Sequence, residues 1–193
     1  MDVADGPGKH DLRGQTGDGS AREQAASCRK VAIRFKSFET RILYYDERPA
    51  ADIENELDAR KVSLDELLRA SDIITIHLPL LKETRALNGK HELSLMKPNT
   101  VLLNTSRGPI VDEEALIEAL TENRIAGAGL DVFEKEPIST DNPLLKLENV
   151  LLTPHTAGHS YEGWFRRAQF AWENIQRVAT GQQPLSLAFP EEA

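Results

Sequence analysis

The sequence lacks several features that define whole classes of protein. It has a single cysteine, Cys28, which excludes an internal disulfide framework and a zinc cluster built on cysteines. It has no apolar run long enough to cross a bilayer, and no signal-peptide core at its start. Its 23 Lys and Arg are outnumbered by 31 Asp and Glu, and the net charge of −8 argues against nucleic acid or an anionic membrane as a partner. These absences predict a soluble, cytoplasmic protein.

The chain does contain enough apolar residues to bury a core, because 40% of its 193 residues are hydrophobic. Its length suits one domain, or one domain with an appendage. From residue 31 onward, apolar runs alternate with helical patterns, which is typical of an α/β fold with a doubly wound parallel sheet. The runs expected to form strands are residues 41–46, 72–77, 101–105, 126–132 and 150–153.

Helices are expected between these runs. Ser63 and Asp112 each stand where a helix N-cap is needed, because their side-chain oxygens can accept a bond from a free backbone N–H. Residues 161–180 carry apolar side chains at helical spacing, which predicts a long amphipathic helix. Residues 1–29 have many glycines and no apolar run, so we predict an irregular segment there.

Three chemically important side chains follow the last three apolar runs: Arg107, Glu136 and His155. Because the carboxyl ends of parallel strands meet at one edge, where open α/β folds bind ligands, we expect these side chains to lie together. A guanidinium can bind an oxyacid, and an imidazole beside a carboxylate can move a proton. The pattern predicts an oxidoreductase site.

Several motifs in a fixed order carry a family resemblance. They are His77-Leu78-Pro79-Leu80 with Glu83-Thr84, the run 106–113, the run 130–137, and Pro154-His155. From residue 31 to about 181 the chain resembles the NAD-binding half of the D-isomer-specific 2-hydroxyacid dehydrogenases. The resemblance implies a Rossmann-like domain over residues 30–181, with a C-terminal tail at 182–193. It also implies NAD as cofactor, a small 2-hydroxyacid or 2-ketoacid as substrate, and a homodimer.

The same resemblance assigns roles to the three side chains. Arg107 would hold the substrate carboxylate and polarise the carbonyl that is reduced, for which a forked guanidinium is suited. His155 would be the general acid and base, because imidazole titrates near neutrality. Glu136 would accept a hydrogen bond from this imidazole and favour its protonated form. Glu134 is a rival for that last role, but Glu136 directly precedes Pro137 and fits the motif better.

The resemblance also implies a set of cofactor-binding residues. Asp46 would bind the adenosine ribose hydroxyls and favour NAD over NADP, because its charge repels a ribose phosphate. The full predicted set is Asp46, Leu78, Pro79, Thr84, Thr105, Ser106, Arg107, Asp131, His155 and Gly158. No metal cluster stands out, and hydride chemistry of this type needs none.

The family's dinucleotide fingerprint is disrupted in this chain. Gly17 and Gly19 are present, but Arg22 stands where the third glycine belongs, and no apolar strand precedes them. We therefore predict that the sheet lacks its first central strand, so that residues 41–46 pair directly with 73–77 or remain unpaired. A flexible polar linker and a local reading-frame slip are the two explanations that the sequence leaves open. Either would weaken NAD binding.

Two other functions compete with that of a dehydrogenase. The chain could be a non-catalytic, NAD-sensing interaction protein of the corepressor kind, since the family contains such members. It could also be an inactive remnant of the fold. The retained Arg107, Glu136 and His155 favour the enzyme, whereas the lack of room for the family's substrate-binding domain and the altered phosphate loop favour the remnant.

Overall fold

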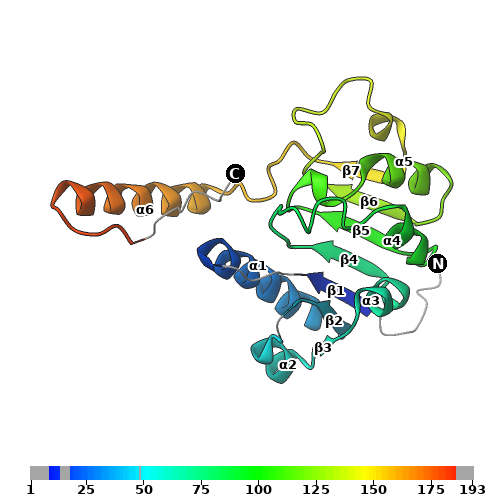
Figure 1. Cartoon of the computed structure of the whole chain (residues 1–193), viewed down its shortest axis with the longest axis horizontal. Helices are drawn as coiled ribbons and strands as arrows, with labels where there is room; N and C mark the ends of the chain where they lie inside the picture. The colour runs from blue at the N-terminus through cyan, green and yellow to red at the C-terminus, as the bar shows by residue number, and fades with distance from the viewer. Residues whose placement is uncertain (1–8, 14–17, 48, 186–193) are drawn as a thin grey trace. The chain divides into compact units, whose positions relative to one another are not determined.

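The computed structural model describes residues 9–13, 18–47 and 49–185. The chain forms two compact units, Met1–His155 and Thr156–Ala193. The first unit is built on one parallel sheet flanked by helices, and the second contains the long helix α6 (Tyr161–Ala179) (Figure 1). The domain bounds expected from the sequence, 30–181, stay a prediction.

The sheet of the first unit has seven strands in the order β3-β2-β1-β4-β5-β6-β7. Every neighbouring pair is parallel (Figure 1). The strands are β1 (Lys9–Arg13), β2 (Arg41–Tyr45), β3 (Arg60–Lys61), β4 (Ile73–Ile76), β5 (Val101–Asn104), β6 (Gly127–Leu130) and β7 (Val150–Leu152). The predicted α/β, Rossmann-like doubly wound sheet is therefore confirmed.

The expected loss of the first central strand is wrong. β1 lies between β2 and β4, with Asp11 opposite Leu43 on one side and Ile74 on the other. The predicted direct pairing of residues 41–46 with 73–77 does not occur. The prediction assumed that a central strand must be an apolar run. A central strand can also form through its backbone hydrogen bonds, and here β1 pairs with both β2 and β4.

The prediction that residues 1–29 are irregular is also wrong for the part of this range that the structure describes. Besides β1, the helix α1 (Asp18–Lys36) begins well before residue 30. Residues 21–26 are Ala, Arg, Glu, Gln, Ala and Ala, all of which have high helix propensity. Of the disrupted fingerprint, Gly19 and Arg22 lie within α1, and Gly17 lies outside the described residues.

The remaining helices of the first unit connect successive strands. They are α2 (Ala51–Leu57), α3 (Leu64–Ala70), α4 (Lys90–Leu95), α5 (Glu113–Thr121) and the short 3₁₀ segments η1 (Gly108–Ile110) and η2 (Pro143–Lys146). The two predicted caps are present. The Ser63 hydroxyl accepts a bond from Glu66 N (3.2 Å), and the Asp112 carboxylate accepts one from Ala115 N (3.0 Å). These bonds begin α3 and α5.

The core of the first unit consists of two clusters. The larger one packs β4 and β5 against helices α3, α4 and α5, and its fully buried members include Ile74, Leu102, Leu67 and Leu116. The smaller one packs β2 against α1 and α2 around Ile42. Each buried aliphatic side chain contributes about 1.5–3 kcal/mol, so the larger cluster fixes the strands that carry the predicted site.

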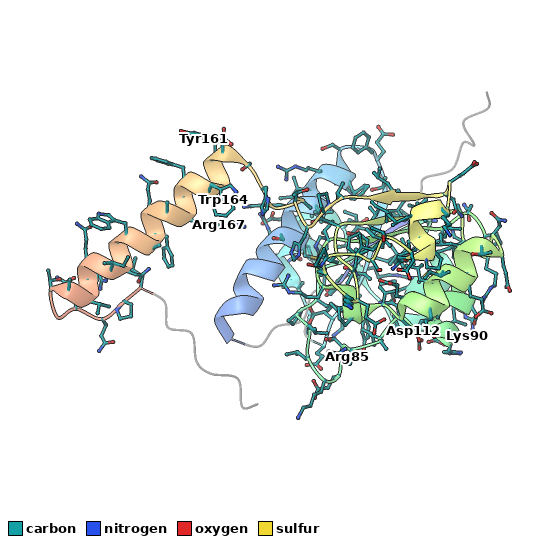
Figure 2. All side chains as sticks on the ribbon, turned by 90° about the horizontal axis from the view of Figure 1, so that it is seen from above. Arg85, Lys90, Asp112, Tyr161, Trp164 and Arg167 are labelled. Atoms are coloured by element: carbon teal, nitrogen blue, oxygen red, sulfur yellow. The ribbon has the colours of Figure 1, made fainter. Side chains whose placement is uncertain are left out.

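In the second unit, α6 begins at Ser160, whose hydroxyl accepts a bond from Gly163 N (3.0 Å). Its apolar stripe is present as predicted, but none of the α6 side chains is buried. Trp164 is exposed, and the Arg167 guanidinium lies 5.8 Å from its ring centre (Figure 2). Across the described part of the chain, no helix has the length and apolar character needed to span a membrane.

Candidate active site

The predicted site residues lie at the carboxyl edge of the sheet. The strands β5, β6 and β7 are neighbours, and the loops that follow them carry Arg107, Glu136 and His155 respectively (Figure 1). The register pairs Asn104 with Leu130, and Leu130 with Leu152, so the three strands end at the same level. This arrangement follows from parallel pairing and short loops.

The loop that carries Arg107 is held by hydrogen bonds on both sides of it. The Asn104 side chain accepts a bond from Ser106 N (3.0 Å) and donates one to the Arg107 carbonyl (3.0 Å). The Ser106 hydroxyl donates to the Ile76 carbonyl at the end of β4 (2.6 Å). The guanidinium of Arg107 is exposed and donates to the Ser106 carbonyl (2.7 Å), which leaves its other donors open to a ligand.

Gly108 allows this loop to lie against the loop after β6. A Cβ atom at residue 108 would stand 1.9 Å from the Phe133 carbonyl oxygen, so no other residue fits there without a backbone shift. Phe133 in turn begins the segment that contains Glu136. The close approach therefore sets the distance between the arginine loop and the carboxylate loop.

Glu136 and His155 form a direct pair. His155 Nδ1 lies 2.7 Å from Glu136 Oε2, and the other carboxylate oxygen of Glu136 accepts a bond from Phe133 N (3.1 Å). A carboxylate at Nδ1 fixes the orientation of the imidazole and leaves Nε2 as the nitrogen that can exchange a proton with a ligand. Glu134 makes no such contact with His155, so Glu136 is the partner that the motif predicted.

The ionised form of Glu136 is favoured. Partial burial acts to raise the pKa of Glu136, but the hydrogen bonds from His155 and Phe133 N and the charges of His155 and Arg107 oppose it. Together they outweigh burial and hold the pKa below its ordinary value. The carboxylate is therefore available to accept a bond from the imidazole throughout the neutral range.

His155 reaches its position through a turn at the end of β7. Thr153 is fixed by its N–H bond to the Leu130 carbonyl (3.0 Å) and by its hydroxyl bond to the buried carboxylate of Asp131 (2.5 Å). His155 itself has a left-handed backbone with φ of 54°. A histidine in this region is uncommon and costs backbone energy, so the turn depends on such anchors.

A pocket opens beside the pair. Its volume is about 380 Å³, and it is lined by Phe133, Glu136, Pro137, Ile138, Pro154 and His155. The lining is apolar apart from the two paired side chains. This combination suits a small organic ligand that exchanges a proton with one imidazole.

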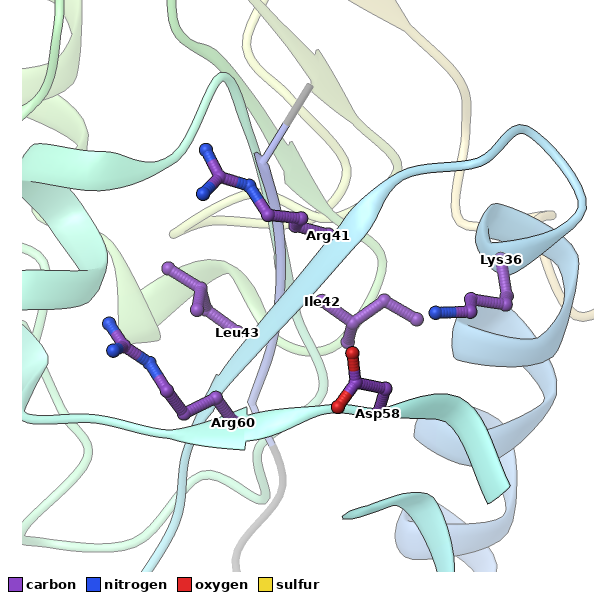
Figure 3. A pocket seen from close by; sticks show the side chains of 6 residues that line it. All are labelled: Lys36, Arg41, Ile42, Leu43, Asp58 and Arg60. Carbon is purple, nitrogen blue, oxygen red and sulfur yellow. The ribbon is translucent and has the colours of Figure 1, made fainter. Parts of the chain in front are cut away.

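A second pocket, of about 260 Å³, lies elsewhere (Figure 3). It is lined by Lys36, Arg41, Ile42, Leu43, Asp58 and Arg60. Because Arg41 is the first residue of β2, this pocket belongs to the amino edge of the sheet, opposite the edge that carries the catalytic candidates. It is not part of the candidate active site.

The predicted cofactor residues fall into two groups. Asp46 directly follows β2, and Thr105 and Ser106 directly follow β5, so all three stand at the carboxyl edge. Thr84 is instead fully buried, and its hydroxyl accepts from Leu81 N and donates to the Pro79 carbonyl (both 2.7 Å). Its observed contacts shape the loop after β4 rather than leaving the hydroxyl free for a ligand.

Four further members of that set are placed as follows. Leu78 is buried, and Pro79 is half-buried directly after it. Asp131 is buried against Thr153, as described above. Gly158 belongs to the second unit, so its part in the set stays a prediction. The neighbouring His77 is buried beside the Thr75 hydroxyl, and burial lowers its pKa to about 4, in keeping with a packing role.

Two residues with structural roles at this site carried no predicted role. Asn104 holds the arginine loop, and Glu113 accepts bonds from Glu134 N (3.0 Å) and the Asn142 amide (2.8 Å) in the carboxylate loop. A signal for Asn104 existed in the sequence, because a polar residue that ends a buried apolar run needs partners. Glu113 ends the motif run 106–113, but nothing in the sequence pointed to its bonds, since a glutamate in the first turn of a helix is common.

The geometry is compatible with a dinucleotide. From β1 the chain proceeds outward to β2 and β3 and then returns to β4 on the other side of β1, which creates a switch point where such sheets bind dinucleotides. α1 follows β1 closely, and Asp46 follows β2. Within the described ranges, no group of three or more His, Cys, Asp or Glu side chains could hold a metal ion. Fold and site thus define a dinucleotide-binding α/β domain with an Arg–Glu–His site.

A comparison with known families identifies the domain. Residues 26–157 match the family described as D-isomer specific 2-hydroxyacid dehydrogenase, NAD binding domain. The chain belongs to this family, as the sequence motifs predicted. NAD as the cofactor of the domain and its oxidoreductase lineage are confirmed with it.

Named relatives agree with this assignment. The glyoxylate reductase of Korarchaeum cryptofilum is 49% identical over 83% of this chain and 48% of its own length. The D-3-phosphoglycerate dehydrogenase of Archaeoglobus fulgidus is 43% identical over 79% of this chain and 29% of its own length. The chain therefore spans about half or less of the curated relatives it matches. These relatives are oxidoreductases, which gives no support to a non-catalytic protein or an inactive remnant.

Solved structures share the fold as well. The D-lactate dehydrogenase of Lactobacillus jensenii with NAD⁺ superposes with a TM-score of 0.80 at 27% identity, covering 94% of this chain and 56% of that one. The glyoxylate reductase of Paecilomyes thermophila superposes with a TM-score of 0.79 at 31% identity, covering 96% and 53%.

Proposed function

We propose that this chain is the NAD-binding and catalytic part of an oxidoreductase that interconverts a D-2-hydroxyacid and the corresponding 2-ketoacid. One observation carries the proposal: the His155–Glu136 pair stands at the same sheet edge as the exposed Arg107. A proton-transfer group beside a carboxylate-binding group is what reduction of a 2-ketoacid requires.

His155 serves as the general acid in this proposal. Its Nδ1 is engaged by Glu136, so Nε2 delivers a proton to the oxygen that becomes the hydroxyl, and takes it back in the reverse direction. The ionised Glu136 stabilises the imidazolium that this step needs. The apolar side chains of Phe133, Pro137, Ile138 and Pro154 line the pocket beside the pair.

Arg107 binds the acid group of the substrate. Its fork of N–H donors matches a carboxylate in two parallel bonds, and its positive charge polarises the adjacent carbonyl. The bonds from Asn104 and Ser106 hold the backbone at this position, so the guanidinium starts from a fixed anchor.

NAD supplies or accepts the hydride when it is bound. The residues proposed to hold it are Asp46, Leu78, Pro79, Thr105, Ser106, Asp131 and Gly158, together with Arg107 and His155, while Thr84 shapes the loop after β4. Asp46 provides the preference for NAD over NADP, since a carboxylate at the end of the second strand repels a ribose phosphate.

The substrate class is a small, unbranched 2-ketoacid, with glyoxylate as the first to test. Support comes from the relatives named glyoxylate reductase. A homodimer, which the family resemblance implies, and a cytoplasmic location complete the proposal. Light scattering of the purified chain would test the dimer.

The test measures binding and turnover separately. Calorimetric titration of the purified chain should show saturable binding of NADH and much weaker binding of NADPH. NADH oxidation with glyoxylate should fall by about 10²–10⁴-fold in His155→Ala, as expected for loss of a general acid. His91→Ala is the matched control, because His91 is exposed on α4 and away from the pocket. A chain that binds no NADH, or turnover that survives His155→Ala, would contradict the proposal.

A further inference from the structure

The loop that carries Glu136 has few anchors of its own. It follows β6, and residues 134–137 are all exposed. Phe133 is buried and its N–H bonds to Glu136, so it fixes the carboxylate relative to the start of the loop. Phe133 belongs to the larger core cluster, so it anchors the start of the loop. The exposed segment that follows it needs further contacts to hold Glu136 in place.

Glu113 provides two contacts of that kind. It is the first residue of α5, a helix that is capped by Asp112 and packed into the larger core cluster. Its Oε2 accepts a bond from Glu134 N (3.0 Å), and its Oε1 accepts one from the Asn142 side-chain amide (2.8 Å). One carboxylate thus joins both ends of the loop to the start of a core helix.

The geometry points to Glu113 as a positioning residue for the His155–Glu136 pair. It touches neither His155 nor the pocket lining, so it acts through the backbone of the loop. The Glu134 N–H that it fixes adjoins Phe133, whose N–H bonds to Glu136. Hydrogen bonds to a charged acceptor are stronger than neutral ones. The Glu113 carboxylate can therefore hold the exposed Glu134 N–H even though water competes for it. The inference rests on the proposed function only in taking this pair as the catalytic one.

Three variants isolate this role. Glu113→Gln keeps the size of the side chain but leaves it with one carbonyl acceptor, so the bond to Glu134 N or to the Asn142 amide is lost. Glu114→Gln is the matched control, because Glu114 is the next residue of α5 and is exposed. Glu113→Gln with Asn142→Asp restores the second bond with donor and acceptor exchanged. Aspartate also keeps the cap that Asn142 provides to Leu144 N.

The measurement is NMR of the isotope-labelled full chain without cofactor or substrate. The His155 Nδ1 proton should give a downfield signal that exchanges slowly with water. In Glu113→Gln its exchange should accelerate about tenfold, together with that of the Phe133 and Glu134 amides, as expected for loss of a charge-assisted bond. The amides of β4 and β5 should be unchanged. The control should match the wild type, and the double variant should restore slow exchange.

Other outcomes would overturn the inference. Unchanged exchange of the His155 proton in Glu113→Gln would show that the pair does not depend on this carboxylate. Equal acceleration in the control, or acceleration throughout the sheet, would indicate a general effect on charge or stability. Failure of the double variant to restore slow exchange would show that the bond between Glu113 and Asn142 does not help to position the pair. None of these readouts requires turnover, so failure of the proposed function would be seen separately.

Discussion

The two sides of the sheet are held in different ways. Around β4–β7, buried or half-buried polar side chains fasten loops to the core, as Asn104, Glu113 and Asp131 do. Around β1–β3, the described side-chain contacts include exposed ion pairs, such as Arg29 with Asp52 and Glu56. The first side fixes several loops to the core in this way. On the second side the buried Tyr44 hydroxyl anchors one loop by accepting a bond from Ala50 N (2.8 Å), and ion pairs join α1 and α2 at the surface.

This difference matches the functions proposed for the two sides, which are proton transfer at β4–β7 and binding of the adenosine half of NAD at β1–β3. Proton transfer needs the imidazole, the carboxylate and the guanidinium to stay within fractions of an ångström, so their loops need directional bonds. A site that holds the extended adenosine half of a dinucleotide mainly needs its strands in order, which the parallel ladders supply. The comparison predicts that perturbations on the β4–β7 side have larger effects.

The largest effect is expected from the core of that side. Leu102, in β5, is fully buried, so Leu102→Ala should lower the free energy of unfolding by about 2–5 kcal/mol through lost contacts and a cavity. Leu151→Ala, in β7, is the control, because Leu151 is 72% exposed and its loss should cost less than about 0.5 kcal/mol. Urea unfolding measures both, and similar values for the two would remove the basis of the comparison.

A smaller effect is expected on the other side. Arg29→Ala removes the ion pairs with Asp52 and Glu56 at the surface of α1 and α2, and should lower the free energy of unfolding by less than about 1 kcal/mol. The loss should shrink further in high salt, which screens exposed charges. Arg34→Ala on the same helix serves as the control, since Arg34 bonds only to the Lys30 carbonyl of its own helix. A loss above 2 kcal/mol would show that these pairs are structurally important.

The β4–β7 side was also the more predictable one. Its strands are apolar runs bounded by turns, and Arg107, Glu136 and His155 follow them in motifs, so strand order alone brings them to one edge. β1 was missed because Lys9–Arg13 is polar and is specified by its two neighbours rather than by its own pattern. Local patterns cannot reveal a strand that exists because of its partners.

Within the candidate site, the sequence predicted which side chains are reactive and missed what holds them. Asn104 and Glu113 act through bonds to backbone groups many residues away or across a turn, and such partners depend on the folded loops. The need for glycine at residue 108 likewise arises from the carbonyl of Phe133, which lies far along the chain. Motifs report chemistry, whereas anchoring is a property of the tertiary structure.

The smallest effect that would sharpen the comparison is a pH dependence. The pKa of Glu136 is lowered in the folded chain, so the unfolded chain binds more protons at acidic pH. The stabilisation from this group is therefore fully present above the ordinary glutamate pKa of about 4.3, and is lost as the pH falls through the lowered folded-state value. Glu136→Gln should remove this part of the acid sensitivity, as measured by urea unfolding at a series of pH values.

The control is Glu134→Gln, in the same exposed loop, where the side chain does not contact His155. Its stability should keep the acid slope of the wild type, because the backbone N–H of residue 134 still bonds to Glu113. If both variants lose the same slope, the sensitivity belongs to the net charge of the loop and not to the His155–Glu136 pair. If only Glu136→Gln loses the acid slope, the contact between His155 and Glu136 stabilises this loop. The contact proposed for proton transfer would then also fix the loop, as expected for the β4–β7 side of the sheet.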